Sequence, residues 1–255
     1  MKNTIKKNIR KVENRITQAC QRVKRDPRDI QIILAVKTVK PEHILTAADL
    51  GYPMVGENRV QEARRKIKQL SDRADKLEWH YIGHIQSNKV NKVIRFASMV
   101  HSIDRMKIVR KMNHRLKKVG KTMDVLIQVN TSGEDSKYGI HPSDAINFVR
   151  EATKFKRLNI KGLMTIGLFS DNWPKVREGF AQLRQLRDTI SDQNIPDIQM
   201  QHLSMGMTND FELAIEEGAT MVRIGRAIFG ERDTPDSYYW PGIDSAPYSS
   251  NHISE

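Results

Sequence analysis

The chain has 255 residues, of which 38% are hydrophobic and 29% are charged. This length suits one α/β barrel of about 250 residues or two smaller domains, and the hydrophobic fraction excludes general disorder. No apolar run approaches the roughly 20 residues of a membrane span. Cys20 is the only cysteine. This excludes an intramolecular disulfide framework and a cysteine-cluster metal site, and it fits a reducing compartment such as the cytoplasm.

The charge is positive and unevenly distributed. Forty-three Lys and Arg against thirty Asp and Glu give a net charge of +13, with +7 in residues 1–29 and −4 in residues 231–255. A basic surface attracts anions such as phosphates, nucleic acid or acidic lipid headgroups. A merely solvated basic face is the simpler interpretation. The sequence shows no recognition motif or aromatic-rich basic patch, so we expect no specific nucleic-acid partner.

Residues 1–29 are expected to form a basic helix that packs on the core. Their apolar residues recur at the spacing of one helix face: Ile5, Ile9, Val12, Ile16, Ala19 and Val23. The segment lacks the unbroken apolar stretch and the small-residue cleavage site of a secretory signal. A mitochondrial presequence is the alternative, because the segment is rich in Lys and Arg and has few acidic residues.

From residue 30 onward, β-rich runs alternate with helical runs. The pattern predicts strands at 30–37, 54–56, 79–83, 99–103, 123–129, 158–164, 198–204 and 221–224. It predicts helices at 41–50, 59–70, 87–97 (with Ser87 as the cap), 106–119, 142–155, 174–191 and 209–217, and a short turn at 227–229.

Eight strand–helix units after one leading helix predict a (β/α)8 TIM barrel, similar to the barrel domain of alanine racemase. An open doubly wound sheet is the alternative. We expect a single barrel domain over residues 1–230 and an irregular tail over 231–255, which contains several Pro and Ser.

Polar residues or glycines follow the predicted strands at the end where barrel proteins place their chemistry. They are Lys37, Glu57, Asn58, His84, Ser102, Asp104, Asn130, Thr165, Ser204, Gly206, Arg223 and Gly225, and Met164 ends the sixth strand. Lys37 ends a run of Ile, Leu, Ala and Val, so its stem is expected to be buried. A desolvated lysine becomes a nucleophile toward carbonyls. A lysine that only extends its ammonium to solvent is the plainer alternative.

The last two strands end in Ser204-Met205-Gly206-Met207 and Arg223-Ile224-Gly225-Arg226. In many barrels these two loops hold a phosphate, and backbone N–H groups at Gly206, Gly225 and Arg226 could contact one. Tight turns alone also explain the glycines. Arg223 is expected either to face a ligand in the mouth or to pair with a carboxylate of the barrel.

Other common sites are not indicated. His80 and His84 are four residues apart, which is about 13 Å in a strand, too far to share a metal ion. The sequence has no glycine-rich dinucleotide loop, Walker-type loop or nucleophile elbow. A buried lysine, a phosphate-binding turn and an arginine at one mouth fit an aldehyde that carries a phosphate. Pyridoxal 5′-phosphate is such a ligand.

The sequence resembles the pyridoxal-phosphate homeostasis protein family, whose fold is similar to the alanine racemase barrel. Seven segments carry the resemblance, in family order: 33–38 (ILAVKT), 56–62 (GENRVQE), 80–90 (HYIGHIQSNKV), 129–139 (VNTSGEDSKYG), 162–165 (GLMT), 203–207 (LSMGM) and 220–230 (TMVRIGRAIFG). Any one segment is weak evidence, whereas seven in order are specific.

The resemblance implies that Lys37 forms a Schiff base with pyridoxal 5′-phosphate. The spacing to Gly56 matches the family for Lys37 and is too short for Lys40. The resemblance also implies that Arg223 meets the ring nitrogen. The remaining cofactor-binding residues are expected to be Ser204, Met205, Gly206 and Gly225 around the phosphate, with Asn58, His84 and Met164 lining the pocket.

The expected function is non-enzymatic: reversible binding of the cofactor for intracellular vitamin B6 homeostasis, with no catalytic residue. An arginine facing the ring nitrogen makes a weak electron sink, and a racemase needs a second acid/base on the opposite face of the substrate. Alanine racemases take that group from a further domain, and the tail expected here, 231–255, has only 25 residues. A single-domain racemase and a basic nucleic-acid-binding protein are the alternatives. Expected partners are the cofactor and its apoenzymes, and a monomer is the default state.

Overall fold

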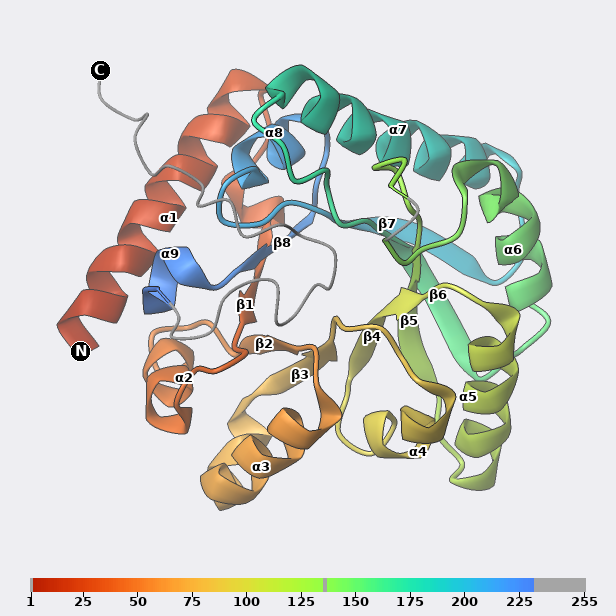
Figure 1. Cartoon of the computed structure of the whole chain (residues 1–255), viewed down its shortest axis with the longest axis horizontal. Coiled ribbons are helices and arrows are strands. Elements are labelled where there is room, and N and C mark those ends of the chain that lie inside the picture. Colours follow the sequence, from red (N-terminus) through yellow and green to blue (C-terminus); the bar gives the residue numbers. More distant parts are fainter. Residues whose placement is uncertain (1, 135–136, 232–255) are drawn as a thin grey trace.

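The computed structural model describes residues 2–134 and 137–231. Its centre is a closed barrel of eight parallel strands in sequence order (Figure 1). The strands are β1 (Gln31–Ala35), β2 (Met54–Glu57), β3 (Glu78–Tyr81), β4 (Met99–Ile103), β5 (Met123–Gln128), β6 (Leu158–Met164), β7 (Ile198–Ser204) and β8 (Met221–Ile224). Pairing of β1 with β8, which places Ile33 opposite Arg223, closes the barrel. The (β/α)8 prediction is confirmed, and the open sheet is wrong.

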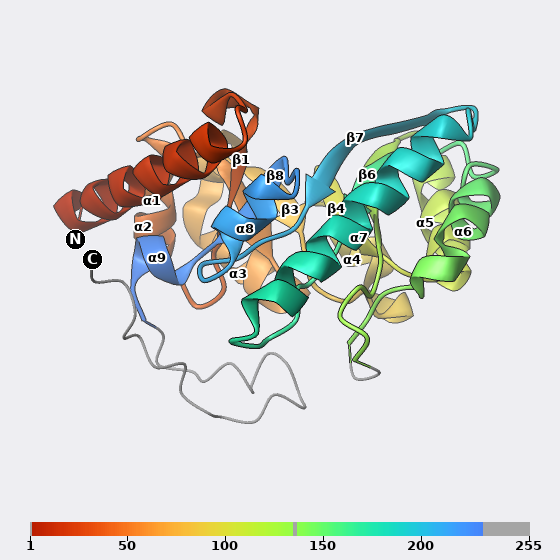
Figure 2. The same cartoon turned by 90° about the horizontal axis from the view of Figure 1, so that it is seen from above.

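Helices surround the barrel: α1 (Lys2–Arg22), α2 (Pro41–Ala48), α3 (Val60–Leu70), α4 (Val90–Val93), α5 (Met106–Lys118), α6 (Ala145–Ala152), α7 (Trp173–Asp192), α8 (Phe211–Glu216) and α9 (Arg226–Phe229). Their buried faces pack on the outer side of the strands to form the main hydrophobic core. Figure 2 shows the same arrangement from above, with α7 lying along β6 and β7. No described helix is long and apolar enough to cross a membrane.

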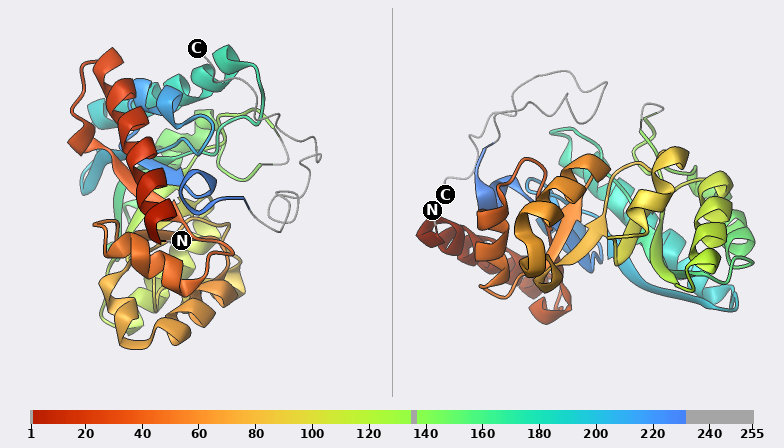
Figure 3. Two further views of the ribbon diagram at one scale, coloured as in Figure 1. Left: turned by 90° about the vertical axis from the view of Figure 1, so that its left-hand side faces the viewer. Right: turned by 90° about the horizontal axis from the view of Figure 1, so that it is seen from below.

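The leading helix packs across the elements that end the barrel. α1 lies against α2, α8 and α9 (Figure 3). Arg15 forms a bidentate ion pair with Glu212 of α8, and Arg25 donates hydrogen bonds to the carbonyl oxygens of Ile215 (2.7 Å) and Ala219 (2.8 Å). Arg25 thereby adds side-chain hydrogen bonds at and just beyond the end of α8. The first helix therefore joins the last β/α units to the first.

Two local expectations are wrong. Val23 follows the end of α1 and is 36% exposed, whereas Ile5, Ile9, Val12, Ile16 and Ala19 are buried as predicted. The helix expected from Ser87 to residue 97 is a 3-10 turn followed by the four-residue α4, and Ser87 makes no capping hydrogen bond. Most other elements agree to within two residues, and the first part of the 142–155 helix is a 3-10 turn. The irregular tail expected for 231–255 lies, beyond Glu231, outside the described residues.

Candidate functional site

The inside of the barrel combines an apolar layer with a polar one. Ile33, Met99, Leu126, Met164 and Met221 form a separate buried cluster inside the strands. Side chains alternate along a strand, so residues two positions from these also face inward. By this rule His101 faces inward from β4 and Arg223 from β8, and Lys37 shares its direction with Ile33 at the mouth. All three are buried, at 0%, 4% and 3% exposure.

Arg223 is held in place by two hydrogen bonds inside the barrel. Its Nη1 donates to Ser204 Oγ and its Nη2 to the carbonyl oxygen of Thr165, both at 2.8 Å. Burial lowers the pKa of Arg223 to about 10, so the guanidinium remains charged at neutral pH. No ion pair joins it to a carboxylate of the described residues. Of the two alternatives for Arg223, pairing with a barrel carboxylate is therefore not observed among those residues.

A chain of hydrogen bonds continues from Ser204 to the opposite end of the barrel. Ser204 Oγ lies 2.9 Å from His101 Nδ1, His101 Nε2 lies 2.9 Å from His80 Nδ1, and His80 Nε2 lies 3.0 Å from Glu78 Oε1. Arg223 can only donate to Ser204 Oγ, and an ionised Glu78 can only accept from His80 Nε2. The two bonds between them can run in either direction, because a serine oxygen accepts up to two hydrogen bonds and an imidazole nitrogen can donate or accept. With His101 neutral and its proton on Nε2, Ser204 donates to His101, His101 to His80, and His80 to Glu78.

This direction of donation needs a neutral His101 with its proton on Nε2. Burial lowers the pKa of His101 well below its usual value, and the nearby His80, Arg223 and His202 act in the same direction. The hydrogen bond from His80 lowers the pKa of Glu78. Both shifts favour the protonation states that the hydrogen-bond chain needs at neutral pH.

The backbone beside Lys37 is anchored from outside the barrel. Lys66 of α3 is buried and donates to the carbonyl oxygen of Val36 at 2.5 Å and to Glu57 Oε1. Glu57 Oε2 in turn accepts from the backbone N–H of Asn58 (3.1 Å) and of Arg59 (3.4 Å). The Lys66–Glu57 pair thus ties the end of β1 to the end of β2. Burial raises the pKa of Glu57, and its bonds with Lys66 oppose that shift.

Thr38 makes the turn that follows Lys37. Its φ is +62°, in the left-handed region that a β-branched residue rarely adopts. Its N–H lies 3.3 Å from Glu62 Oε2, and its hydroxyl donates to the carbonyl oxygen of Lys37. Lys66 also lies 3.8 Å from Glu62. The surrounding charges therefore support a strained conformation directly beside the candidate nucleophile.

The turn after β7 depends on a glycine. Gly206 has a φ of +90°, and a Cβ there would lie 2.6 Å from Ala214 Cβ. Asp210 Oδ1 accepts from the N–H of Met207 at 2.5 Å, and the carbonyl oxygen of Gly206 accepts from the N–H of Arg223. These contacts bring the Ser204–Met207 turn next to β8. This turn therefore requires a glycine at position 206, and its role in binding a phosphate stays a prediction.

Four of the predicted cofactor-binding residues already contact other parts of the protein. The side chain of Met205 packs in the outer core, and its N–H donates to the carbonyl oxygen of Met221. The hydroxyl of Ser204 is already used by Arg223 and His101. Met164 lies in the inner apolar cluster. Gly225 immediately precedes α9 and accepts hydrogen bonds from Ile228 and Phe229.

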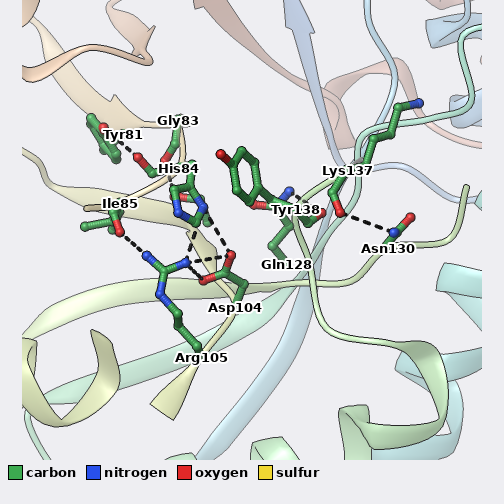
Figure 4. A network of polar contacts seen from close by, with 11 residues as sticks. Tyr81, Gly83, His84, Ile85, Asp104, Arg105, Gln128, Asn130, Lys137 and Tyr138 are labelled. Atoms are coloured by element: carbon green, nitrogen blue, oxygen red, sulfur yellow. Dashed lines mark hydrogen bonds and ion pairs between the residues drawn. The ribbon is translucent and has the colours of Figure 1, made fainter. Parts of the chain in front are cut away.

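Asn58 and His84 lie on the β2 and β3 side of the mouth. Asn58 Oδ1 is buried and has no hydrogen-bond partner among the described residues. The His84 ring stacks on Tyr138, with ring centroids 3.6 Å apart, and its Nδ1 lies 3.2 Å from Asp104 Oδ2 (Figure 4). Arg105 also pairs with Asp104 and donates to the carbonyl oxygen of Ile85. His84 is thus part of a rim that joins the loops after β3, β4 and β5.

Pattern reasoning missed His80, His101, Lys66 and Tyr138. His101 interrupts an apolar strand at an inward-facing position, and Lys66 interrupts the buried stripe of α3, so both carried a detectable signal. The sequence suggested His80 and His84 only as a possible metal-binding pair. In the structure His80 bonds to His101, whereas His84 stacks on Tyr138. No group of three His, Cys, Asp or Glu in residues 2–134 and 137–231 could hold a metal ion.

The barrel and its polar mouth define a (β/α)8 protein with its ligand site at the carboxyl ends of the strands. The family model for the alanine racemase N-terminal domain matches residues 2–233. The pyridoxal phosphate homeostasis protein of Aquifex aeolicus is 41% identical over 224 residues, which cover 88% of this chain and 96% of the relative. The chain therefore belongs to the alanine racemase N-terminal domain family and, within it, to the pyridoxal phosphate homeostasis proteins.

Solved structures agree with this assignment. A protein of unknown function from Bifidobacterium adolescentis is 36% identical, with a TM-score of 0.86, over 89% of this chain and 95% of its own. PipY of Synechococcus elongatus PCC7942, with pyridoxal phosphate bound, is 30% identical with a TM-score of 0.74. That match covers 84% of this chain and all of the PipY chain. The resemblance inferred from the seven segments is confirmed.

The Lys66–Glu57 pair gives a testable stability prediction. Lys66→Met is expected to lower the free energy of unfolding by about 3–5 kcal/mol, because Glu57 loses its charge partner inside the protein. The double variant Lys66→Met/Glu57→Gln is expected to lose at least about 1 kcal/mol less than the sum of the single variants. Urea denaturation measures all three. Lys68→Met, on the exposed face of the same helix, is the matched control. Strict additivity of the two changes would contradict the pairing.

The hydrogen-bond chain predicts a pH dependence of stability. His101 stays neutral in the folded protein, whereas in the unfolded chain it takes up a proton below pH about 6.5. Stability contributed by His101 is therefore lost as the pH falls, by about 1.4 kcal/mol between pH 7.5 and 5.5. His101→Gln, which keeps a donor and an acceptor, should reduce the difference between these two pH values by that amount. An unchanged difference, measured by urea denaturation, would show that His101 is not held neutral.

Proposed function

We propose that this chain binds pyridoxal 5′-phosphate at the mouth of the barrel and holds it reversibly on Lys37 for vitamin B6 homeostasis, without turnover of amino acids. The single observation that carries the proposal is the burial of Lys37, which shares an inward direction with Arg223 at the same mouth. The relatives named pyridoxal phosphate homeostasis protein and the PipY structure with pyridoxal phosphate bound support the same ligand.

The residues of the mouth fit a phosphorylated pyridine aldehyde. Asn58 Oδ1 is a buried acceptor that the described residues leave without a partner. The turn at Gly206 requires a glycine, because α8 packs against this position and leaves no room for a Cβ. The Ser204 hydroxyl is already committed, so we assign the phosphate mainly to the backbone at Gly206 and Gly225. Ser204 then contributes by fixing Arg223.

The bound cofactor would supply an electrophilic aldehyde. Lys37 would supply the amine: its Nζ forms the C=N bond with the aldehyde carbon, and the aldehyde oxygen leaves as water. Burial at the strand end favours the neutral, nucleophilic form of a lysine. The support of Val36 by Lys66, and of the Thr38 N–H by Glu62, holds the backbone on either side of this residue. These contacts fix the main chain on both sides of Lys37.

Arg223 supports binding without turnover. Its guanidinium is charged, and it already donates to Ser204 and Thr165. A charged guanidinium has no tendency to give a proton to a ring nitrogen, so the ring remains a weak electron sink. We further propose that the protein is a cytoplasmic monomer that supplies cofactor to apoenzymes. Cys20, a buried free thiol, fits a reducing compartment.

Spectroscopy with matched lysine variants tests the proposal. Wild-type protein mixed with pyridoxal phosphate is expected to show an absorbance band near the visible edge that borohydride abolishes, with the reduced label on Lys37 by mass spectrometry. Lys37→Ala is expected to lose the band entirely. Lys40→Ala removes an exposed lysine three residues away and should retain it. A band that persists in Lys37→Ala, or a label spread over Lys40 and Lys89, would overturn the assignment.

A further inference from the structure

One short segment carries most of the net charge of the chain. Residues 86–121 contain eleven Lys and Arg and a single acidic residue, Asp104. The net charge of this segment is +10, against +13 for all 255 residues. It comprises α4, β4 and α5, and α4 packs against α5 on one side of the barrel (Figure 1). The charge is thus concentrated on one face and is not spread evenly over the surface.

Seven basic side chains of this segment reach solvent and have no ionic partner among the described residues. We call the following set the basic face: Lys92, Arg95, Lys107, Arg110, Lys111, Lys117 and Lys118. All are exposed except Lys111, which is partly buried. The ion pairs of the segment among the described residues are those of Asp104 with Arg105 and with His84. Unneutralised like charges destabilise a fold by self-repulsion, so the face needs an explanation.

Helix geometry aligns part of the face. Lys107, Lys111 and Lys118 lie four and seven residues apart, so they fall on one stripe about 16 Å long. Ile108, Val109, Met112 and Leu116 form the opposite, buried side of α5. A duplex nucleic acid carries one charge per about 1.7 Å of its axis, so about ten phosphates span the stripe.

The chemistry of the face favours phosphates over other anionic partners. Protein interfaces are enriched in aromatic residues and depleted in lysine, whereas interfaces with nucleic acid are strongly basic. The exposed large hydrophobic residues of residues 2–134 and 137–231 are Val23, Val119, Tyr138 and Trp173, and only Val119 adjoins α5. α5 therefore has no exposed apolar face with which to enter a membrane. No exposed aromatic side chain is available on the face for stacking on bases.

We propose that the basic face of α4 and α5 binds the phosphate backbone of duplex nucleic acid without sequence preference. This goes beyond cofactor binding and does not depend on it, because the basic face includes none of the candidate cofactor-binding residues. Lys37→Ala should therefore bind duplex as tightly as the wild-type protein does. Residues 1–29, which include the N-terminal basic helix, have a net charge of +7, which is less than the +10 of residues 86–121.

Fluorescence anisotropy with labelled 20-base-pair DNA duplexes in 150 mM salt tests the proposal. The wild-type protein is expected to bind two unrelated sequences equally, with a Kd of about 1–100 µM and a strong salt dependence. Lys107→Gln/Lys111→Gln/Lys118→Gln should weaken binding by at least about tenfold and reduce the slope of log K against log salt by about 2.7. The matched control Lys6→Gln/Lys7→Gln/Lys11→Gln removes three exposed charges from α1 and should change the affinity by less than about threefold.

Three results would overturn the assignment. The first is no binding of the wild-type protein to duplex at 150 mM salt. The second is an equal loss in both triple variants, which would show that net charge and not this face is responsible. The third is binding to phosphatidylglycerol vesicles without binding to duplex. The band formed with pyridoxal phosphate reports folding of the two triple variants, and circular dichroism reports folding of Lys37→Ala. Failure of the band in wild-type protein would affect the proposed function alone.

Discussion

The burial of one guanidinium governs the inside of this barrel. Arg223 is 4% exposed, and a buried charge is tolerated only where hydrogen bonds replace those of water. Ser204 Oγ and the carbonyl oxygen of Thr165 supply them, and Ser204 is held in place by a further hydrogen bond with His101. His80 and Glu78 continue the chain of hydrogen bonds beyond His101. Glu78, whose side chain is half exposed, is the last acceptor. The hydrogen-bonded chain from Arg223 to Glu78 thus takes the place of apolar side chains along one side of the barrel interior. The Arg223 guanidinium is its end at the mouth.

A second anchor, outside the strands, determines the position of Lys37. Lys66 and Glu57 join the ends of β1 and β2 through charges that face α3. The two buried lysines have different roles. Lys66 has a structural role, and Lys37 lies at the mouth of the barrel. The Lys66–Glu57 pair acts on β1, and the hydrogen bonds of Arg223 act on β8. These strands are neighbours, because Ile33 of β1 pairs with Arg223 of β8. The candidate nucleophile and the candidate ring partner therefore share one rigid support.

Periodicity was enough to predict the architecture, because eight apolar β-rich runs and the stripe of α1 each report burial locally. It was also enough to place Lys37 and Arg223, whose charges end buried strands. Residues that act through distant partners could not be predicted in this way. His101 contacts Ser204 across 103 positions of sequence, and His84 meets Tyr138 only after the loops have folded. The helix predicted from Ser87 to residue 97 is wrong. Its apolar spacing suits a longer helix, but the segment forms a 3-10 turn followed by the four-residue α4.

The central claim is that a charged Arg223, held by Ser204 and Thr165, permits binding of the cofactor but not its use as an electron sink. The most direct measurement is exchange of the α-proton of L-alanine in D₂O, followed by NMR with wild-type protein saturated with pyridoxal phosphate. The account predicts exchange no faster than with free pyridoxal phosphate at the same concentration, and no D-alanine. Rapid exchange that disappears in Lys37→Ala would contradict it and would identify a racemase-like enzyme instead.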